Sequence, residues 1–354
     1  MNSSHSPWPL FSNDLPLARQ WLQPQLAAMP PNIRTGHVAL NLGMYGEIRT
    51  ILNQQQPLEA GAAAQWRFRL ARHDGLANPY CHLVPPAWQE RAAGAIARAM
   101  DHGTTLLVAL NGGLGDHLEA LSLVLPWAQQ NQVHLKFSAS QERQRQFAAL
   151  GWRQGPLKWS EDPAVPAMAI RHWLFNQSPG PAYGSWIEPT ATEQLGKRPR
   201  SMGLLCCWRA AGAGDRLSAH SRSVPFQLVR QFYKHTLARQ PGLSITDISL
   251  WQAWEQQQLS GLGVQLKNPQ QGGLQQLSAL IHANQVLTID TALAHLCVAL
   301  GETGIVLLPL FCDERWQELM QPHNSYAKLL SIKRSTQFGS WDELLAGLDC
   351  SKFS

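Results

Sequence analysis

Residues 104–137 read TTLLVALNGGLGDHLEALSLVLPWAQQNQVHLKF, and this stretch decides the fold. An apolar strand over residues 104–110 is followed by a glycine turn, an apolar helix over residues 117–129 and a second strand over residues 133–137. This order is a βαβ unit, whose crossover helix makes the two strands parallel. We therefore predict an α/β fold with a parallel sheet.

The same alternation returns in the C-terminal half of the chain. Strands are expected over residues 202–208, 243–248, 285–289 and 304–308, and helices over residues 225–238, 274–283, 291–300 and 341–348. Alternation at this spacing predicts a second doubly wound domain. Residues 154–200, rich in Pro, Gly and Ser, are predicted to be a linker or surface loop between the two lobes.

The first hundred residues have a different pattern. Apolar helical segments over residues 15–26, 36–53, 60–71 and 87–101 are separated by proline pairs, with no strand pattern. A degenerate tetratricopeptide-like unit and a simple packing extension both fit. The predicted domains are a helical extension (1–102), a first lobe with its crossover (103–200), a second lobe (201–334) and a C-terminal helix (335–354).

Composition limits the class of protein. The 354 residues are 44 % hydrophobic, enough for two cores, and the net charge is +5. The bases are scattered, so we expect no nucleic-acid partner, although an anionic small ligand or an acidic membrane surface would fit. The six cysteines lack C-x-x-C spacing, so no zinc is expected. No apolar run reaches the roughly 20 residues of a membrane span, and we expect a cytoplasmic protein.

The glycine turn is the first candidate site. It places Asp116 just beyond the first strand, at the end of the sheet where open α/β folds bind ligands. Asp116 is either a general base or a cap of the following helix. The dinucleotide fingerprint fails at Leu118, where its third glycine would stand, which disfavours a nicotinamide-dependent oxidoreductase.

Two further stretches suit an anion. Asp290, Thr291 and Ala292 join a strand to a helix whose first N–H groups can bind phosphate, whereas His295 is expected to pack within that helix. Residues 215–225 include Arg216, His220 and Arg222, and a guanidinium there suits a diphosphate. An ordinary solvated loop is the alternative.

These three stretches, in this order, resemble the heptosyltransferase-like inverting glycosyltransferases, especially the glycosyltransferase-like domains that follow tetratricopeptide repeats in bacteria. Residues 113–118 resemble the family's G-L-G-D-x-L turn, and residues 221–225 its R-S-x-P loop. Residues 280–309 resemble its D-T-A-x-A-H-L block with the flanking strands, followed by D-x-R-W at residues 313–316. The likeness covers residues 104–334 and leaves the first hundred residues out.

The resemblance implies a GT-B fold, in which two Rossmann-like lobes face a cleft and the second lobe holds a nucleotide-sugar donor. It implies metal-independent hexosyl or heptosyl transfer, with inversion, to a glycan, lipid or protein hydroxyl. Peripheral membrane contact would be compatible, and an inactive binding or scaffolding homologue is the alternative. The residues it assigns are Asp116 as catalytic base, Arg222, Ser223, Asp290, Thr291 and Ala292 for the donor, and Gly113, Gly115 and His117 for the acceptor side of the cleft.

Overall fold

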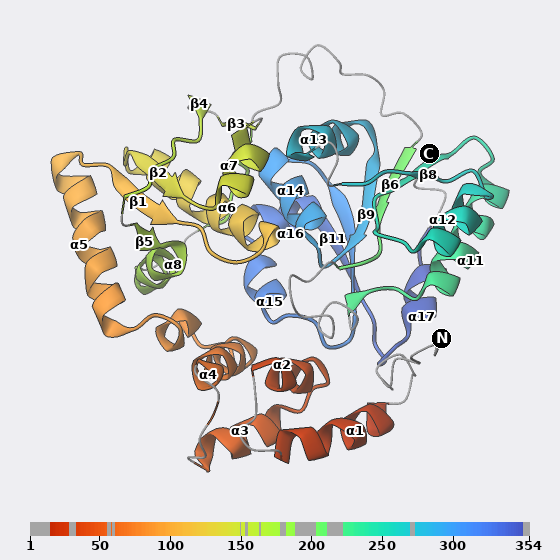
Figure 1. Cartoon of the computed structure of the whole chain (residues 1–354), viewed down its shortest axis with the longest axis horizontal. Coiled ribbons are helices and arrows are strands. Elements are labelled where there is room, and N and C mark those ends of the chain that lie inside the picture. Colours follow the sequence, from red (N-terminus) through yellow and green to blue (C-terminus); the bar gives the residue numbers. More distant parts are fainter. Residues whose placement is uncertain are drawn as a thin grey trace.

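The computed structural model describes residues 15–27, 33–54, 58, 61–148, 150–152, 155–162, 164–177, 182–187, 203–210, 222–269 and 273–349. Arg216 and His220 lie outside these residues. The described chain is a mixed α/β structure with parallel sheets, as predicted (Figure 1). Within these ranges, no helix is both long enough and apolar enough to cross a bilayer.

The larger sheet forms the second lobe. Its six parallel strands are β6 (Gly203–Cys207), β7 (Ser244–Asp247), β8 (Gln265–Leu266), β9 (Gln285–Ile289), β10 (Gly304–Leu308) and β11 (Leu330–Arg334). They lie in the order β11-β10-β9-β6-β7-β8. This is the order of a doubly wound dinucleotide-type fold, in which the direction of winding reverses between the first and fourth strands. The reversal, here between β6 and β9, is where such sheets bind ligands.

Helices cover both faces of this sheet. They are α11 (Phe226–Arg239), α12 (Ala253–Ser260), α13 (Gly273–Ala283), α14 (Ala292–Leu300), α15 (Arg315–Leu319), α16 (Ser325–Leu329) and α17 (Trp341–Ala346). The C-terminal α17 packs against α11, and its residues Trp341 and Leu345 join the core of this lobe. The second doubly wound unit predicted from the alternation is therefore confirmed, although β8, β11, α12, α15 and α16 were not foreseen.

The first lobe has a smaller parallel sheet. Strands β1 (Leu106–Ala109), β2 (Leu135–Ser138) and β5 (Val165–Pro166) lie in the order β2-β1-β5. Its helices are α5 (Pro86–His102), α6 (Leu114–Gln130), α7 (Gln141–Ala148) and α8 (Ala167–Asn176), and β3 (Gly151–Trp152) pairs with β4 (Gly155–Pro156) in a small antiparallel hairpin. The βαβ unit is confirmed, and the winding reverses beside β1.

The prediction of a linker over residues 154–200 is wrong for part of that range. It contains β5 and α8, and Ala169, Ile170 and Leu174 of α8 are buried in the core. The helix was missed because prolines stand close before it and dominate the local pattern. Trp186, in the same range, is 1 % exposed and packs in the core.

The first part of the chain is helical, with α1 (Leu15–Ala27), α2 (Ile33–Asn41), α3 (Tyr45–Asn53), α4 (Ala62–His73) and a 3-10 turn, η2 (Pro79–His82). The predicted helix over residues 36–53 is divided, because Gly43 adopts a φ of +68° that ends α2. Helices α1–α4 share a separate core around Trp66, whereas α5 packs against β1, β5 and α8. The tetratricopeptide-like repeat stays a prediction.

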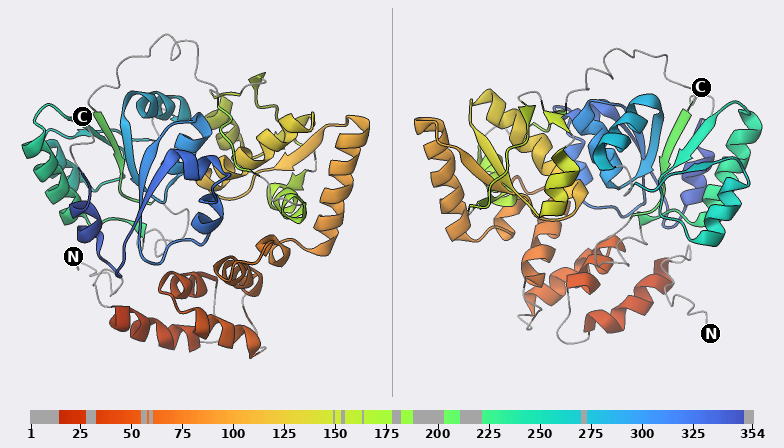
Figure 2. Two further views of the ribbon diagram at one scale, coloured as in Figure 1. Left: turned by 180° about the vertical axis from the view of Figure 1, so that it is seen from behind. Right: turned by 45° about the horizontal axis from the view of Figure 1, so that its top comes forward.

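The three parts contact one another directly. Helices α6 and α14 pack together where Gly115 faces His295, and a Cβ on that glycine would lie 3.1 Å from the imidazole. The Gly184 N–H donates to the Ser122 carbonyl oxygen in α6 at 2.8 Å. The Trp186 N–H donates to the Ala299 carbonyl oxygen in α14 at 2.9 Å. Helices α1–α4 lie along one end of both lobes in all three views (Figures 1 and 2).

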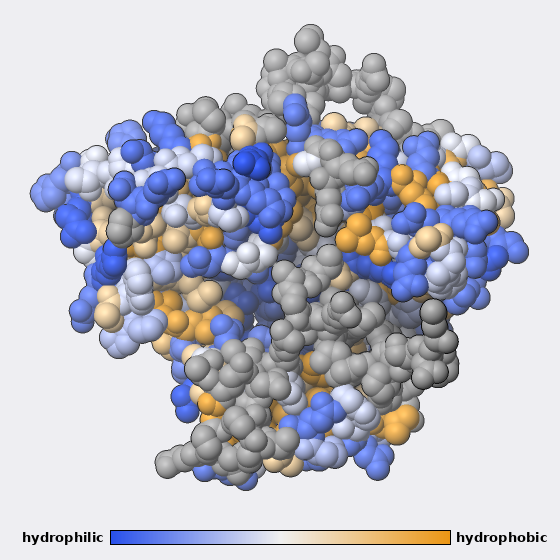
Figure 3. Space-filling view, in the orientation of Figure 1, coloured by the Kyte–Doolittle hydropathy of each residue, from blue (hydrophilic) through white to orange (hydrophobic). Residues whose placement is uncertain are grey.

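Side chains of the described residues give one face of the molecule a mainly polar surface (Figure 3). On the face drawn in Figure 3, hydrophilic side chains predominate and apolar ones form separate small groups. Large hydrophobic side chains that the structure describes as exposed are spread over several elements: Leu17, Leu76, Met100, Met168, Leu250 and Trp254.

Candidate active site

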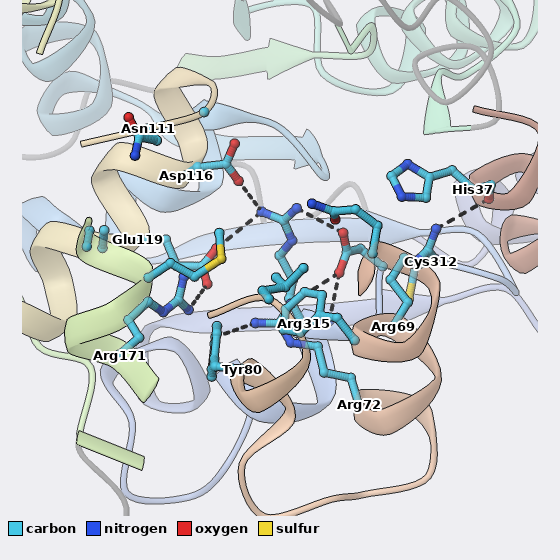
Figure 4. Close-up of a pocket in the computed structure, with 18 of the residues that line it drawn as sticks. His37, Arg69, Arg72, Tyr80, Asn111, Asp116, Glu119, Arg171, Cys312 and Arg315 are labelled. Carbon is cyan, nitrogen blue, oxygen red and sulfur yellow. Dashed lines mark hydrogen bonds and ion pairs between the residues drawn. The ribbon is translucent and has the colours of Figure 1, made fainter. Parts of the chain in front are cut away.

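A cavity of about 360 Å³ lies where the three parts of the molecule meet. The first lobe lines it with residues next to its winding reversal, including Asn111, Gly112 and Asp116. The second lobe contributes Arg222 and the segment from Phe311 to Arg315, and the wall opposite belongs to α2, α4 and η2. Helices that the sequence placed in a separate extension therefore help to enclose the cavity (Figure 4).

Asp116 faces this cavity from the first turn of α6. Its Oδ2 accepts a hydrogen bond from the Gly113 N–H at 2.8 Å, and its Oδ1 accepts one from Arg315 Nη1 at 2.9 Å. The side chain is still 44 % exposed. The cap residue of α6 is Gly113, and Asp116 lies three residues on and bonds back to it. The sequence left open whether Asp116 is a general base or a cap of the helix. In the structure the carboxylate bonds to the start of α6 and is also exposed to the cavity.

The backbone makes room for this carboxylate at Gly112. Its φ is +103°, and a Cβ there would lie 2.7 Å from Asp116 Oδ2. A glycine is required twice over, because other residues rarely adopt this φ and because a side chain would displace the carboxylate.

Arg222 and Asp290 form a pair at the winding reversal of the second lobe. Arg222 Nη1 donates to the Asp290 backbone oxygen at 3.0 Å and to its Oδ2 at 3.1 Å. The Asp290 side chain is 3 % exposed, whereas that of Arg222 is 23 % exposed and lines the cavity. Asp290 therefore lies behind Arg222 and orients its guanidinium.

The other residues assigned to the donor surround this pair. Ser223 Oγ accepts a hydrogen bond from the Ala210 N–H at 3.1 Å, which ties the loop to the end of β6. Thr291 caps α14 and its Oγ1 lies 3.0 Å from Thr288 Oγ1, and Ala292 begins the helix. Neither Thr291 nor Ala292 lines the cavity described here.

Of the residues assigned to the acceptor side, Gly113 lies in the turn beside Asp116. Gly115 lies in the first turn of α6, where that helix packs against α14. His117 is buried beside Phe147 and does not line this cavity. Burial and, to a lesser extent, the nearby Arg143 lower the pKa of His117 to about 4, so the ring is neutral at pH 7. His295 is buried, as expected, with Nδ1 2.7 Å from the Tyr326 hydroxyl.

A network of buried charges was not foreseen in the sequence. Arg315 also donates to Glu119 Oε2 at 3.2 Å and to Asp313 Oδ2 at 2.8 Å (Figure 4). Arg171 of α8 pairs with Glu119, and its Nη2 lies 3.5 Å from Glu318 Oε1. We call the following residues the charge network: Arg69, Arg72, Asp116, Glu119, Arg171, Asp313, Glu314, Arg315 and Glu318.

Helix α4 supplies two arginines to this charge network. Arg69 pairs with both carboxylate oxygens of Glu314, at 2.7 Å from Nε and 2.9 Å from Nη2. Arg72 Nη2 lies 3.1 Å from Glu318 Oε2 and 2.5 Å from the Tyr80 hydroxyl. The arginines thus contact acidic residues far along the chain. The D-x-R-W stretch includes Glu314, whereas Glu318 lies outside it.

The guanidinium groups keep the buried acids ionised. Burial alone would raise the pKa of Glu119, but Arg171 and Arg315 outweigh it and lower that pKa to about 2. Burial likewise opposes ionisation of Asp313, and Arg315 and Arg69 hold its pKa well below its usual range. No three His, Cys, Asp or Glu side chains among the described residues are placed to hold a metal ion.

No family model matches the sequence. No curated protein matches it either. Several solved structures match it. The chain is similar to Escherichia coli ADP-heptose LPS heptosyltransferase II, with 10 % identity over 70 % of this chain and 96 % of that one and a TM-score of 0.44. It is similar to a glycosyl transferase of family 9 from Veillonella parvula DSM 2008, with 11 % identity over 65 % of this chain and 86 % of that one and a TM-score of 0.40. For the E. coli heptosyltransferase WaaC with ADP the identity is 17 %, over 70 % of this chain and 97 % of that one, and the TM-score is 0.39.

Proposed function

We propose that this protein is a glycosyltransferase that moves a sugar from a nucleoside-diphosphate donor to an acceptor hydroxyl. The observation that carries the proposal is that Asp116 and Arg222 line the same cavity. They come from the winding reversals of two different parallel sheets, the positions at which such sheets bind ligands. The three motifs that resemble inverting glycosyltransferases lie on the same two lobes.

In this proposal Asp116 removes the proton of the acceptor hydroxyl. A carboxylate has about four lone-pair positions, and the hydrogen bonds from Gly113 and Arg315 use one on each oxygen. The acceptor oxygen attacks the anomeric carbon from the face opposite the diphosphate and forms the new glycosidic bond. The bond from that carbon to the diphosphate oxygen breaks, its electron pair leaves with the diphosphate, and the configuration inverts. A positioned base contributes about 10² to 10⁴ in rate.

Arg222 stabilises the departing diphosphate. Its guanidinium is oriented by Asp290 before substrate binds, so little reorganisation accompanies the development of negative charge. The start of α14, next to Asp290, adds the partial positive charge of a helix N-terminus. We propose that these groups replace a divalent metal ion, and activity in EDTA equal to that in Mg²⁺ is the expected result.

A donor screen tests the proposal. Calorimetry with UDP, GDP, ADP and their sugars identifies the nucleotide, and release of nucleoside diphosphate with and without candidate acceptors then measures turnover. The proposal requires that at least one nucleotide bind and that its sugar be transferred. Absence of binding to all of them at millimolar concentration contradicts it.

Nucleotide-sugar binding without transfer is a second candidate function. The observation that favours it is that both oxygens of Asp116 already accept hydrogen bonds within the protein. Binding of a nucleotide sugar with neither transfer nor hydrolysis, in wild type and in Asp116→Asn alike, would select this function over the first.

A further inference from the structure

We infer that helix α4 of the N-terminal region positions Asp116 for sugar transfer, acting through Arg315. The inference rests on the proposed function for its chemistry, but the physical coupling stands on the structure. It makes Arg69, in the N-terminal helices, a positioning residue for the Asp116 carboxylate in the first lobe.

Arg315 is the second-lobe contact to Asp116. The Nη1–Oδ1 distance is 2.9 Å, and the guanidinium is also fixed by Asp313, whose Oδ2 lies 2.8 Å from Nη2. Asp313 Oδ1 accepts the Arg315 backbone N–H at 2.9 Å as well. Because a guanidinium is planar and donates in fixed directions, contacts at Nη1 and Nη2 set its orientation. Any shift of residues 313–315 therefore moves the Arg315 guanidinium, which donates the hydrogen bond to Asp116.

Helix α4 fixes those same residues. Arg69 and Glu314 form a two-bond pair whose side chains are 9 % and 2 % exposed. Arg69 Nη2 also donates to Asn41 Oδ1 at 2.9 Å, which ties the pair to α2. Arg72 Nη1 lies 3.6 Å from Asp313 Oδ1. Two adjacent acidic residues thus contact α4. The arginine that follows them contacts Asp116 (Figure 4).

The Arg69–Glu314 pair is strongly directional. Two parallel N–H···O bonds between a guanidinium and a carboxylate fix both groups in one plane. When one partner of a buried pair is removed, the other is left charged and buried, so the segment that carries it must move. A displacement of about 1 Å at a reacting group costs about 10²-fold in rate.

The decisive comparison is between a single and a double substitution. Arg69→Met leaves the buried Glu314 without its ion-pair partner, with the Tyr45 hydroxyl 3.5 Å from its Oε1. Arg69→Met with Glu314→Met replaces the pair by apolar side chains, and we expect its melting temperature to be higher than that of the single variant. We expect kcat to fall about tenfold or more in both variants, with the dissociation constant for the nucleoside diphosphate unchanged. Arg49→Met is the matched control, because it removes the exposed pair with Asp74 within the same helical region. Recovery of kcat in the double variant would show that Arg69 acts only on stability, and the inference would be wrong.

Amide hydrogen exchange measures the coupling without any substrate. The Gly113 N–H donates to Asp116 Oδ2, so its exchange rate reports where that carboxylate lies. We expect exchange of residues 111–120 to accelerate severalfold in the single and the double variant and to stay unchanged in Arg49→Met. Unchanged exchange in the double variant overturns the inference. If exchange is faster in both variants but the wild-type protein transfers no sugar, the coupling between α4 and Asp116 holds and the proposed function is wrong.

Discussion

Arg315 reaches from α15 in the second lobe to Asp116 in the first turn of α6 in the first lobe, with 2.9 Å between Nη1 and Oδ1. The two residues are 199 positions apart in the chain. A single guanidinium therefore links the proposed base to Asp313 of the second lobe and to Glu119 of α6.

Arg315→Lys should lower kcat while leaving nucleotide affinity intact. An ammonium cannot donate to Asp116, Glu119 and Asp313 in the fixed geometry of a guanidinium, so Asp116 loses its orientation. We expect a loss of about tenfold to a hundredfold. Steady-state kinetics with the donor identified in the screen measures it. Arg334→Lys, at an exposed arginine of β11 in the same lobe, is the control and should stay near wild type.

Gly112→Ala should affect both stability and transfer. The φ of +103° costs about 1–3 kcal/mol for a residue with a side chain, and the new methyl group would lie 2.7 Å from Asp116 Oδ2. Gly75→Ala provides the control, because Gly75 has a φ of +72° with nothing within 4 Å. Denaturant melts should show a loss of stability in both variants. Activity should fall only in Gly112→Ala, and equal activity in the two would exclude steric displacement of Asp116.

Asp290→Asn should weaken nucleotide binding. The buried carboxylate orients the Arg222 guanidinium. Loss of its charge weakens a charge-assisted hydrogen bond of a kind worth about 1.5–3 kcal/mol, because an amide oxygen still accepts from the guanidinium but no longer forms an ion pair with it. The dissociation constant for the nucleoside diphosphate should rise about tenfold or more. Calorimetry measures it, with Asp342→Asn at an exposed position of α17 as control. An unchanged constant would mean that Arg222 does not bind the phosphates.

Acid should destabilise the protein through Glu119. Its pKa is about 2 in the folded protein against an ordinary value of 4.5, so the folded state binds this proton less well than the unfolded state. The stabilisation is complete above about pH 5 and is lost as the pH falls toward 2, with a magnitude of about 3 kcal/mol. Urea melts between pH 7 and pH 2 measure it. The slope below pH 5 should be smaller in Glu119→Gln, and the same slope in both proteins would contradict the assignment.

Protonation of His117 should add a loss of stability at higher pH than the loss caused by Glu119. Because its folded pKa of about 4 lies below the ordinary value of 6.5, its contribution to stability is complete above about pH 6.5 and is lost as the pH falls from 6.5 to 4. This window is separate from that of Glu119, so His117→Phe should flatten the profile there alone.

Local patterns in the sequence were enough to predict most of the two sheets. The strands over residues 285–289 and 304–308 have the predicted bounds, because short apolar runs there are flanked by a polar residue or a glycine. The helix over residues 36–53 was wrong because a glycine in an apolar run can either continue a helix or end it. The choice depends on packing between helices, which a single sequence does not show.

The site was predictable only in part. The rule that ligands bind beyond the carboxyl ends of parallel strands was enough to single out Asp116. Arg222 was a candidate because a guanidinium suits a diphosphate, and the role of Asp290 came from the resemblance to the glycosyltransferases. Arg69 and Glu314 lie on segments 245 positions apart, and nothing local distinguishes a buried arginine of α4 from an exposed one. That pair becomes visible only when the third part of the molecule is placed against the other two.

The measurement that tests the central claim most directly is the rate of sugar transfer by Asp116→Asn, compared with wild type at saturating donor. The substitution keeps the size of the side chain and removes its ability to take a proton. The account predicts a loss of about 10² to 10⁴ in kcat with an unchanged dissociation constant for the nucleotide. Transfer at the wild-type rate would show that Asp116 is not the base.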